Sequence, residues 1–192
     1  MASFAVDFDV QLMCRVREGD ANSFSVLLER HRTPVVHFLY RMVQNQAVAE
    51  ELAQEVFLRV YRSRTTYEPS AKFTTWLFRI ATHLALNWLR DGKYEKNRES
   101  LEWDTVGGAV RQLPDRKPTV EQNLLSGVRV QEIREAIQGL PANQKAAVIM
   151  HKYQEMDYAQ IAGVLGCSES AVKSLLFRAY ERLRSRLAHL VA

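Results

Sequence analysis

The hydrophobic positions of this chain recur every three or four residues, which is the spacing of one face of an α-helix. Strand-type alternation of useful length is absent from the sequence, so the pattern predicts an all-α fold. Pro34 falls inside the second helical stretch, where it either kinks the helix or opens a new one. Asp9 is expected to cap a first helix that runs to about Glu18. The next expected helices cover residues 24–44, 47–63 and 75–90. In the last third of the chain, a helical stretch ends at Leu140, and helices over 142–153, 158–165 and 169–187 follow.

Residues 157–187 form the most specific local pattern. Apolar residues at i, i+3, i+4 and i+7 predict a short helix: Tyr158, Ile161, Ala162 and Leu165. Gly166 follows, where a left-handed cap is favoured, and Ser168 can cap the next helix. The sequence therefore predicts a helix-turn-helix. Its second helix buries Val172, Leu176, Ala179, Leu183 and Leu187.

The opposite side of that second helix is suited to DNA. This side carries polar, cationic and aromatic side chains: Ser170, Lys173, Ser174 and Phe177. Arg178 lies on its flank. Five cations stand against one acid, Glu181, between residues 173 and 186. A recognition helix that enters a major groove would present such a face. The alternative is an ordinary helical hairpin with a basic, solvated surface.

The predicted helix over 75–90 is apolar on almost every side except one narrow stripe. The stripe repeats at i, i+3, i+7, i+11 and i+14, and comprises Trp76, Arg79, His83, Asn87 and Arg90. Such groups stack on bases, neutralise phosphates and bond base edges, which favours a nucleic-acid surface. The alternative is a solvated stripe with Trp76 half-buried at its end.

The helix over 47–63 combines acidic and apolar side chains on the side away from its buried face. Those side chains include Glu51, Gln54, Leu58 and Tyr61, with Glu50 and Phe57 at the edge. A leucine and two aromatics among acids suit a protein partner better than water. The alternative, equally weighted by the pattern alone, is that Leu58 and Tyr61 touch a neighbouring helix.

Charged residues of both signs, with paired glycines and two prolines, fill residues 93–121 and predict a flexible linker. Residues 64–74, with Pro69, Ser70 and an aromatic at each end, predict a loop. The expected organisation is therefore two small helical domains, 9–92 and 122–190. The second is a four-helix unit that contains the helix-turn-helix.

Composition narrows the class of protein. The net charge is +4, and 47% of the 192 residues are hydrophobic, as in globular proteins. With two cysteines, no signal-peptide start and no long uncharged apolar run, we expect a soluble cytoplasmic protein without disulfides or membrane insertion. Motifs for catalysis, metal binding or phosphate binding are absent from the sequence, so we expect no enzyme and no cofactor.

Together these features resemble the sigma-70 family of bacterial RNA polymerase sigma factors, in its small extracytoplasmic-function (ECF) branch. The resemblance extends from about residue 9 to residue 187. It is carried by four segments whose order and spacing are specific: AVAEELAQEVFLRVYR (47–62), FTTWLFRIATHLALNWLR (73–90), LPANQKAAVIMHKYQEMDYAQIAGVLG (140–166) and SESAVKSLLFRAYERLR (168–184).

The resemblance implies a factor that binds core RNA polymerase, directs it to −35/−10 promoters and promotes strand opening for transcription initiation. The implied polymerase-binding residues are Glu51, Gln54, Phe57, Leu58 and Tyr61. The residues implied to bind the melted −10 strand are Tyr67, Ser70, Ala71, Lys72, Phe73, Trp76, Arg79, His83, Asn87 and Arg90. For the −35 duplex they are Ser168, Ser170, Lys173, Ser174, Phe177, Arg178 and Arg182.

An anti-sigma factor is a further partner that the resemblance implies. The chain departs from the family pattern at Leu175, where arginine is usual, and at His83, where asparagine is common. By projection Leu175 lies beside the buried face, so it can pack instead of contacting phosphate. The alternative function is a stand-alone helix-turn-helix regulator that binds duplex DNA as a dimer.

Overall fold

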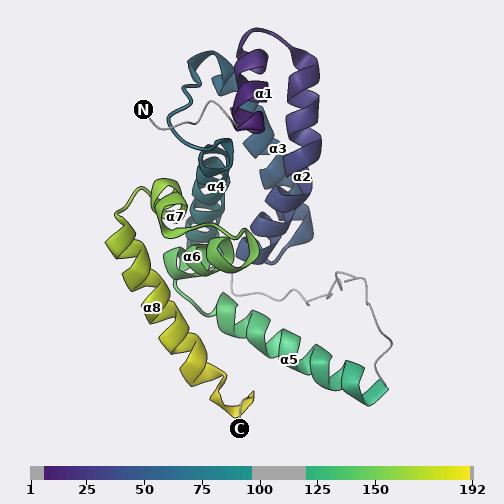
Figure 1. The fold of residues 1–192 in the computed structure, drawn as a ribbon. Coiled ribbons are helices and arrows are strands. Elements are labelled where there is room, and N and C mark those ends of the chain that lie inside the picture. The colour runs from purple at the N-terminus through teal and green to yellow at the C-terminus, as the bar shows by residue number, and fades with distance from the viewer. Residues whose placement is uncertain (1–6, 97–119, 191–192) are drawn as a thin grey trace.

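The computed structural model describes residues 7–96 and 120–190, and within these ranges every regular element is a helix and no strand is present. The all-α prediction is confirmed (Figure 1). The α-helices are α1 (Phe8–Arg17), α2 (Ala21–Val43), α3 (Gln46–Arg62), α4 (Phe73–Lys96), α5 (Val120–Gln138), α6 (Ala142–Tyr153), α7 (Tyr158–Leu165) and α8 (Glu169–Arg186). Two short 3-10 helices are also present: η2 (Ser63–Thr66) comes directly after α3, and η3 (Ala188–Leu190) comes after α8. The predicted linker, 93–121, lies mostly outside the described residues.

The first helices begin at side-chain caps. Asp7, not Asp9 as its position in the pattern suggested, caps α1 by accepting a hydrogen bond from the backbone N–H of Asp9. Asp20 caps α2, where it accepts from the N–H groups of Asn22 and Ser23. The hydrogen bonds from Ser23 hold the pKa of Asp20 below its usual value, because they stabilise the charged carboxylate. Helix α2 then runs without interruption past Pro34.

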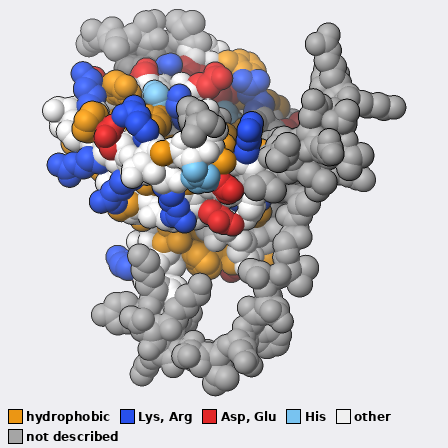
Figure 2. All heavy atoms as spheres, turned by 90° about the horizontal axis from the view of Figure 1, so that it is seen from below, with side chains coloured by type: hydrophobic (Ala, Val, Ile, Leu, Met, Phe, Trp, Pro, Cys, Tyr) orange, Lys and Arg blue, Asp and Glu red, His pale blue; other side chains and the backbone are white. Residues whose placement is uncertain are grey.

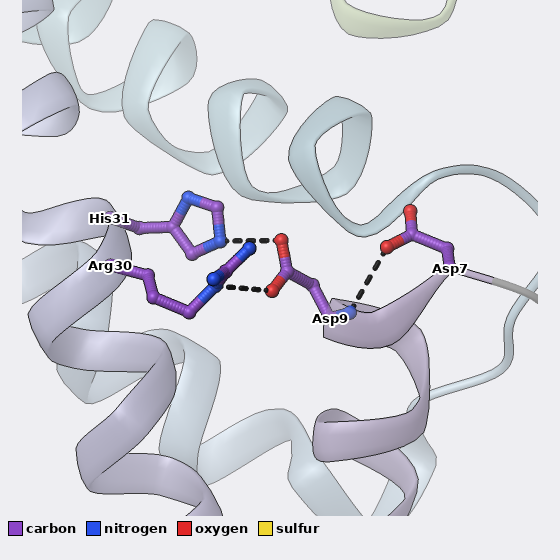
Figure 3. Close-up of polar contacts among 4 residues, drawn as sticks. All are labelled: Asp7, Asp9, Arg30 and His31. Carbon is purple, nitrogen blue, oxygen red and sulfur yellow. Dashed lines mark hydrogen bonds and ion pairs between the residues drawn. The ribbon is translucent and has the colours of Figure 1, made fainter.

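Asp9 is buried because it joins α1 to α2 (Figure 3). One carboxylate oxygen accepts from Nε of Arg30 at 2.9 Å, and the other lies 2.8 Å from Nε2 of His31. The His31 ring also contacts the Phe73 ring, at a centroid distance of 5.3 Å, so the histidine is packed against the first residue of α4 as well. A buried carboxylate with two such partners fixes how the first two helices cross.

Helices α1 to α4 pack around a shared apolar core. Its largest fully buried side chains include Met13, Leu27, Phe38, Phe73 and Leu77. Helix α4 begins at Phe73, two residues earlier than the sequence pattern predicted, because the Phe73 ring is drawn into this core. The same helix continues to Lys96, so residues 93–96 are helical and do not belong to a linker.

The helix-turn-helix forms as predicted from local signals. Gly166 adopts φ 65°, the left-handed conformation that glycine tolerates best, and ends α7. A capping box between Asp157 and Gln160 begins α7, and Ser168 begins α8 by accepting from the N–H of Ala171. Val172, Leu176 and Ala179 are buried, so α8 packs on α6 and α7 through the predicted face.

The two halves of the chain are packed against each other. Figure 1 shows α7 beside α4 and α6 near the lower ends of α2 and α4, and these helix pairs are in contact. The buried apolar residues form one continuous cluster that includes both halves. The two helical units are therefore in direct contact, which the hydrophobic pattern did not predict.

We expect Asp9→Asn to lower the free energy of unfolding by about 1–3 kcal/mol, the usual cost of weakening a buried, charge-assisted hydrogen bond. Urea unfolding at neutral pH measures the change. Glu29→Gln, an exposed acid next to Arg30, is the matched control and should change stability by less than about 0.5 kcal/mol. Equal stability of Asp9→Asn and the unsubstituted protein would show that this network does not hold α1.

Candidate nucleic-acid and polymerase interface

The outer face of α3 carries acidic, amide and apolar side chains together. We call Glu51, Gln54, Leu58 and Tyr61 the α3 face; all four are exposed, Leu58 by 48% and Tyr61 by 40%. The Arg64 guanidinium stacks on the Tyr61 ring at 4.2 Å, and Phe24 of α2 meets the other side of that ring edge-on at 5.1 Å. Tyr61 therefore contacts a neighbouring helix, as the alternative interpretation expected, while 40% of its surface stays exposed; its contact with a protein partner stays a prediction.

Phe57 does not belong to the α3 face. It was expected at the edge of that surface, but the structure buries it in the core with 6% of its surface exposed. The physical reason is its position one helical turn after Ala53, on the side of α3 that packs inward. Phe57 thus anchors α3 to the core, and its side chain is not accessible to a protein partner.

The predicted stripe along α4 is exposed. We call Trp76, Arg79, His83, Asn87 and Arg90 the α4 stripe; all are exposed except Trp76, which is half-buried. Leu77, Phe78, Ala81, Leu84 and Ala85 are buried on the remaining sides of the helix. A helix that is anchored on several sides holds its one polar line rigidly, as a surface for an extended single strand requires.

Two buried aromatic rings support Trp76 at the N-terminal end of the α4 stripe. Trp76 contacts Tyr67 at a ring-centroid distance of 4.9 Å and Phe73 at 5.9 Å. Tyr67 and Phe73 were both expected to contact DNA, yet they are buried, with 4% and 0% of their surfaces exposed. They are drawn inward because α1 and α2 supply the apolar surroundings, which leaves Trp76 as the ring that a base can reach.

Burial also changes the chemistry of Tyr67. Its hydroxyl finds no hydrogen-bond partner among the described residues, and burial raises the pKa of the phenol from 10.0 to about 12. Its carbonyl oxygen accepts a hydrogen bond from Nη1 of Arg17 at 3.4 Å, which ties the loop to α1. The exposed tip of the loop is made of Glu68, Pro69, Ser70 and Lys72, with Ala71 half-buried.

The predicted DNA-binding side of α8 is open to solvent. Ser170, Lys173, Ser174, Phe177 and Arg178, which we call the α8 face, line one shallow surface pocket. Phe177 is 68% exposed, the largest value among the exposed large hydrophobic side chains of the described residues. Ser168 and Arg182 are exposed beside this face. Figure 2, which looks at the molecule from below, shows Lys and Arg side chains gathered on the side where α8 lies.

Phe177 is exposed on the α8 face instead of being buried in the core. Its neighbours on the α8 face are hydroxyls and cations, the groups that contact phosphates and base edges in a groove, while its ring suits a thymine methyl. Leu175 lies on the other side of α8, half-buried against the core. This position agrees with the helical projection, which placed Leu175 beside the buried face.

A pocket of about 110 Å³ lies between α4 and the helix-turn-helix, beside the contact of α4 with α7. Its lining comes from both halves of the chain: Thr82, His83 and Leu86 on α4, and Asn143, Val164, Leu165, Cys167 and Leu175 in the second half. The hydroxyl of Thr82 is fully buried and has no hydrogen-bond partner within the described residues. Sequence reasoning missed this contact, although two threonines within an apolar helix, Thr75 and Thr82, were a signal for it.

Two further properties are observed over the described ranges, 7–96 and 120–190. In them we find neither a cluster of three His, Cys, Asp or Glu side chains that could hold a metal ion nor a helix long and apolar enough to cross a bilayer.

Comparison with known proteins gives the family. Residues 27–94 match the family model of Sigma-70 region 2, and residues 130–183 match that of Sigma-70, region 4. The RNA polymerase sigma factor CarQ of Myxococcus xanthus is 35% identical over 178 residues, which cover 93% of this chain and 97% of CarQ. The ECF RNA polymerase sigma-E factor of Haemophilus influenzae is 30% identical, covering 95% and 97% of the two chains.

Solved structures support the same fold. CnrH, in complex with the cytosolic domain of CnrY, aligns with a TM-score of 0.69 at 19% identity over 94% of this chain and 97% of CnrH. The sigma factor RpoE of Bartonella quintana, in complex with the anti-sigma factor NepR, aligns with a TM-score of 0.69 at 20% identity over 88% and 98%. On its sequence and its family models, the chain belongs to the sigma-70 family, in the extracytoplasmic-function branch of RNA polymerase sigma factors.

Proposed function

We propose that this protein binds core RNA polymerase, directs it to promoters with −35 and −10 elements, and stabilises the opened strands at the start of transcription. The observation that carries the proposal is the combination, in one chain, of the α4 stripe with the α8 face. The first suits unstacked bases of a single strand, and the second suits a duplex groove. A stand-alone duplex-binding regulator would have no use for the α4 stripe, and family membership favours the sigma factor.

The proposed division of labour follows the two halves of the chain. Residues 9–92 would bind polymerase and the −10 element, 122–190 would bind the −35 element, and 93–121 would connect them. Helix α4 ends at Lys96 and helix α5 begins at Val120, both within the bounds of that connection. The function requires no catalytic group or cofactor in this chain, and it would be exercised in the cytoplasm, where core polymerase works.

The α3 face is the proposed docking surface for polymerase. Leu58 supplies an exposed apolar anchor, Gln54 and Glu51 supply polar contacts at one and two helical turns from it, and Tyr61 is held in place by Arg64. Interfaces commonly concentrate their energy in such a small group around an apolar centre.

For the −10 element we propose that the loop tip and Trp76 capture unstacked bases while the rest of the α4 stripe follows the strand. Ser70, Ala71 and Lys72 are placed at the loop tip, close to the ring cluster under Trp76. Base stacking on an aromatic ring is worth about 1–3 kcal/mol per base, which offsets part of the cost of opening the duplex. Tyr67, Phe73 and Phe57 have supporting roles in this assignment.

An anti-sigma factor is a proposed second partner. The support is that two proteins of the same fold are solved in complexes: CnrH with the cytosolic domain of CnrY, and the sigma factor RpoE with the anti-sigma factor NepR. The exposed α3 face and α8 face are the surfaces that such a regulator would have to cover to prevent polymerase and promoter binding.

Replacing Gln54 and Leu58 together by alanine should weaken binding to core polymerase by about tenfold or more, because truncating the centre of an interface costs over about 1 kcal/mol per anchor. Equilibrium titration of labelled protein with core enzyme measures the effect. Val26→Ala, another exposed apolar truncation, is the control on α2. An unchanged affinity in the double variant would remove the α3 face from the docking surface.

On the α8 face, Lys173→Ala and Phe177→Ala should fail in different ways. Lys173→Ala should reduce the dependence of log affinity on log salt by about one phosphate contact, measured on holoenzyme with −35 duplex. Phe177→Ala should instead lose discrimination at one thymine by about tenfold while keeping the salt slope. Lys152→Ala on α6 is the control for charge. Identical losses in both variants would contradict the separate roles.

Tyr67→Phe should leave promoter opening unchanged, because the phenol is buried, and should flatten the alkaline pH dependence of stability. The folded-state pKa of about 12 lies above the unfolded value near 10, so the folded chain holds this proton more tightly. Unfolding free energy should therefore fall as pH rises through 10 to 12 in the unsubstituted protein and fall less in the variant. Urea unfolding at pH 8, 10 and 11 measures this, with Tyr61→Phe as the exposed control. Strongly reduced promoter opening by Tyr67→Phe would restore a direct DNA contact.

A further inference from the structure

Three helices of the second unit meet at His151, which lies in the last turn of α6. Its ring is 5.6 Å from the Tyr158 ring of α7, centroid to centroid, and the two ring planes are inclined by 30°. Its Nδ1 lies 2.9 Å from the hydroxyl oxygen of Tyr180 on α8. We call His151, Tyr158 and Tyr180 the His151 cluster; none of the three is part of the α8 face.

The His151 cluster is continuous with the α8 face. Lys173 lines the shallow pocket of that face, and its Nζ lies 5.9 Å from the centroid of the Tyr158 ring. A cation over the face of an aromatic ring is attracted by the electrons of the ring. Tyr158 is 37% exposed, and His151 is half-buried. Contacting side chains therefore lead from the α8 face across the start of α7 to the end of α6.

The position of the cluster suits the backbone of a duplex. When the second helix of a helix-turn-helix lies in the major groove, the first helix crosses the sugar–phosphate backbone. Tyr158 is the first residue of that first helix, α7, and His151 stacks on it. Ammonium, hydroxyl and imidazole N–H groups are donors that can bind phosphate oxygens. Lys173, Tyr158 and His151 therefore offer three such donors beside the groove.

Tyr180 controls where the neutral His151 ring carries its proton. Burial raises the pKa of the Tyr180 phenol, and the nearby Tyr158 raises it further. The hydroxyl therefore keeps its proton near neutral pH and can donate it to Nδ1 of His151. A ring that accepts at Nδ1 carries its own proton on Nε2, which leaves an N–H donor for a phosphate oxygen. Tyr180 is thus a positioning residue.

Protonation of His151 would add a positive charge to this site. The titratable and charged groups that face the cluster from its three helices are Lys152 on α6, Tyr158 on α7, and Lys173 and Tyr180 on α8. Lysines stay charged and tyrosines stay neutral from about pH 5.5 to 8, so the histidine is the member whose charge changes. Within the described residues the ion pairs of histidines lie elsewhere, and no carboxylate pairs with His151. A bound phosphate would supply the missing negative charge, so that proton and phosphate favour each other.

We infer that the His151 cluster, with Lys173, is a phosphate-binding site for the backbone of the −35 duplex, and that His151 makes the affinity of this site depend on pH. Protonated His151 holds the phosphate more tightly than neutral His151, because the hydrogen bond is then assisted by charge. Affinity for the −35 duplex therefore rises as the pH falls through the range in which the imidazole takes up a proton. The inference rests on the proposed function and adds a contact and a pH dependence to it.

The variant His151→Gln, which is neutral at every pH, tests the site. Full-length protein bound to core polymerase is titrated with a labelled −35 duplex at pH 5.5, 6.5 and 8, and binding is followed by fluorescence anisotropy. For the unsubstituted protein, affinity should rise about three- to tenfold from pH 8 to 5.5, the effect of one charged hydrogen bond at a partly exposed site. The slope of log affinity against log salt should steepen by about one phosphate contact. Both changes should be absent in His151→Gln, and comparison on the same polymerase cancels the pH response of the polymerase itself.

A second variant fixes the charge instead of removing it. His151→Arg should bind the −35 duplex at pH 8 as tightly as the unsubstituted protein does at pH 5.5, because a guanidinium is always charged and can stack on the Tyr158 ring. The matched control is His189→Gln, which removes a histidine of the same unit that is paired with Glu132 and should keep the full pH dependence. Thermal unfolding at pH 5.5 and 8 shows whether each variant is folded, and the arginine variant decides alone if the glutamine variant is not.

Two outcomes would overturn the inference. One is the same pH dependence in a folded His151→Gln variant as in the unsubstituted protein, since the cluster would then serve only to pack the three helices. The other is binding by His151→Arg at pH 8 that is no tighter than that of the unsubstituted protein at the same pH. If the unsubstituted protein with core polymerase binds the −35 duplex no better than core polymerase alone at any pH, the proposed function itself fails, which is a separate result.

Discussion

Helix α4 imposes the main constraint on this fold, because it must satisfy three different surroundings at once. Its inward sides complete the core with α2 and α3, and one flank carries the packing of α7. The exposed remainder is the α4 stripe together with Trp88 and Asp91. This explains why the sequence of α4 is apolar almost all the way round, a pattern that otherwise indicates a fully buried helix. The polar stripe is informative because so little of the helix is left for it.

The same constraint accounts for the aromatic residues at the start of α4 and in the loop before it. Phe73 and Tyr67 anchor the start of the helix against α1 and α2, where His31 and Asp9 close the other side of the core. A loop that must hold an unstacked base gains precision when the residues below it are locked by packing. Burial of these two rings is therefore compatible with a role in DNA opening, exerted through the position of Trp76 and the loop tip.

Features set by local chemistry were predictable from the sequence. Gly166 and Ser168 define the turn through their own conformational and capping preferences, and Val172 and Leu176 follow the helical period. Asp9 was misassigned as a cap for the opposite reason. Asp7 and Asp9 have equal capping ability, and the choice depends on His31, which is far along the chain and close only after folding. Burial of Phe57, Tyr67 and Phe73 depended on neighbours in the same way.

The contact between the two halves was beyond prediction because hydrophobic periodicity tells which face is covered and not what covers it. Thr75, Thr82 and Gly163 carry no strong propensity signal, and Lys145 reads as an ordinary surface lysine until the end of α2 is placed beside it. Polar residues at a covered surface are costly unless they are hydrogen-bonded. Gln138 and Lys145 meet this requirement by donating to the carbonyl oxygens of Arg41 and Met42 at the end of α2, partners that lie about one hundred residues away along the chain and come close only after folding.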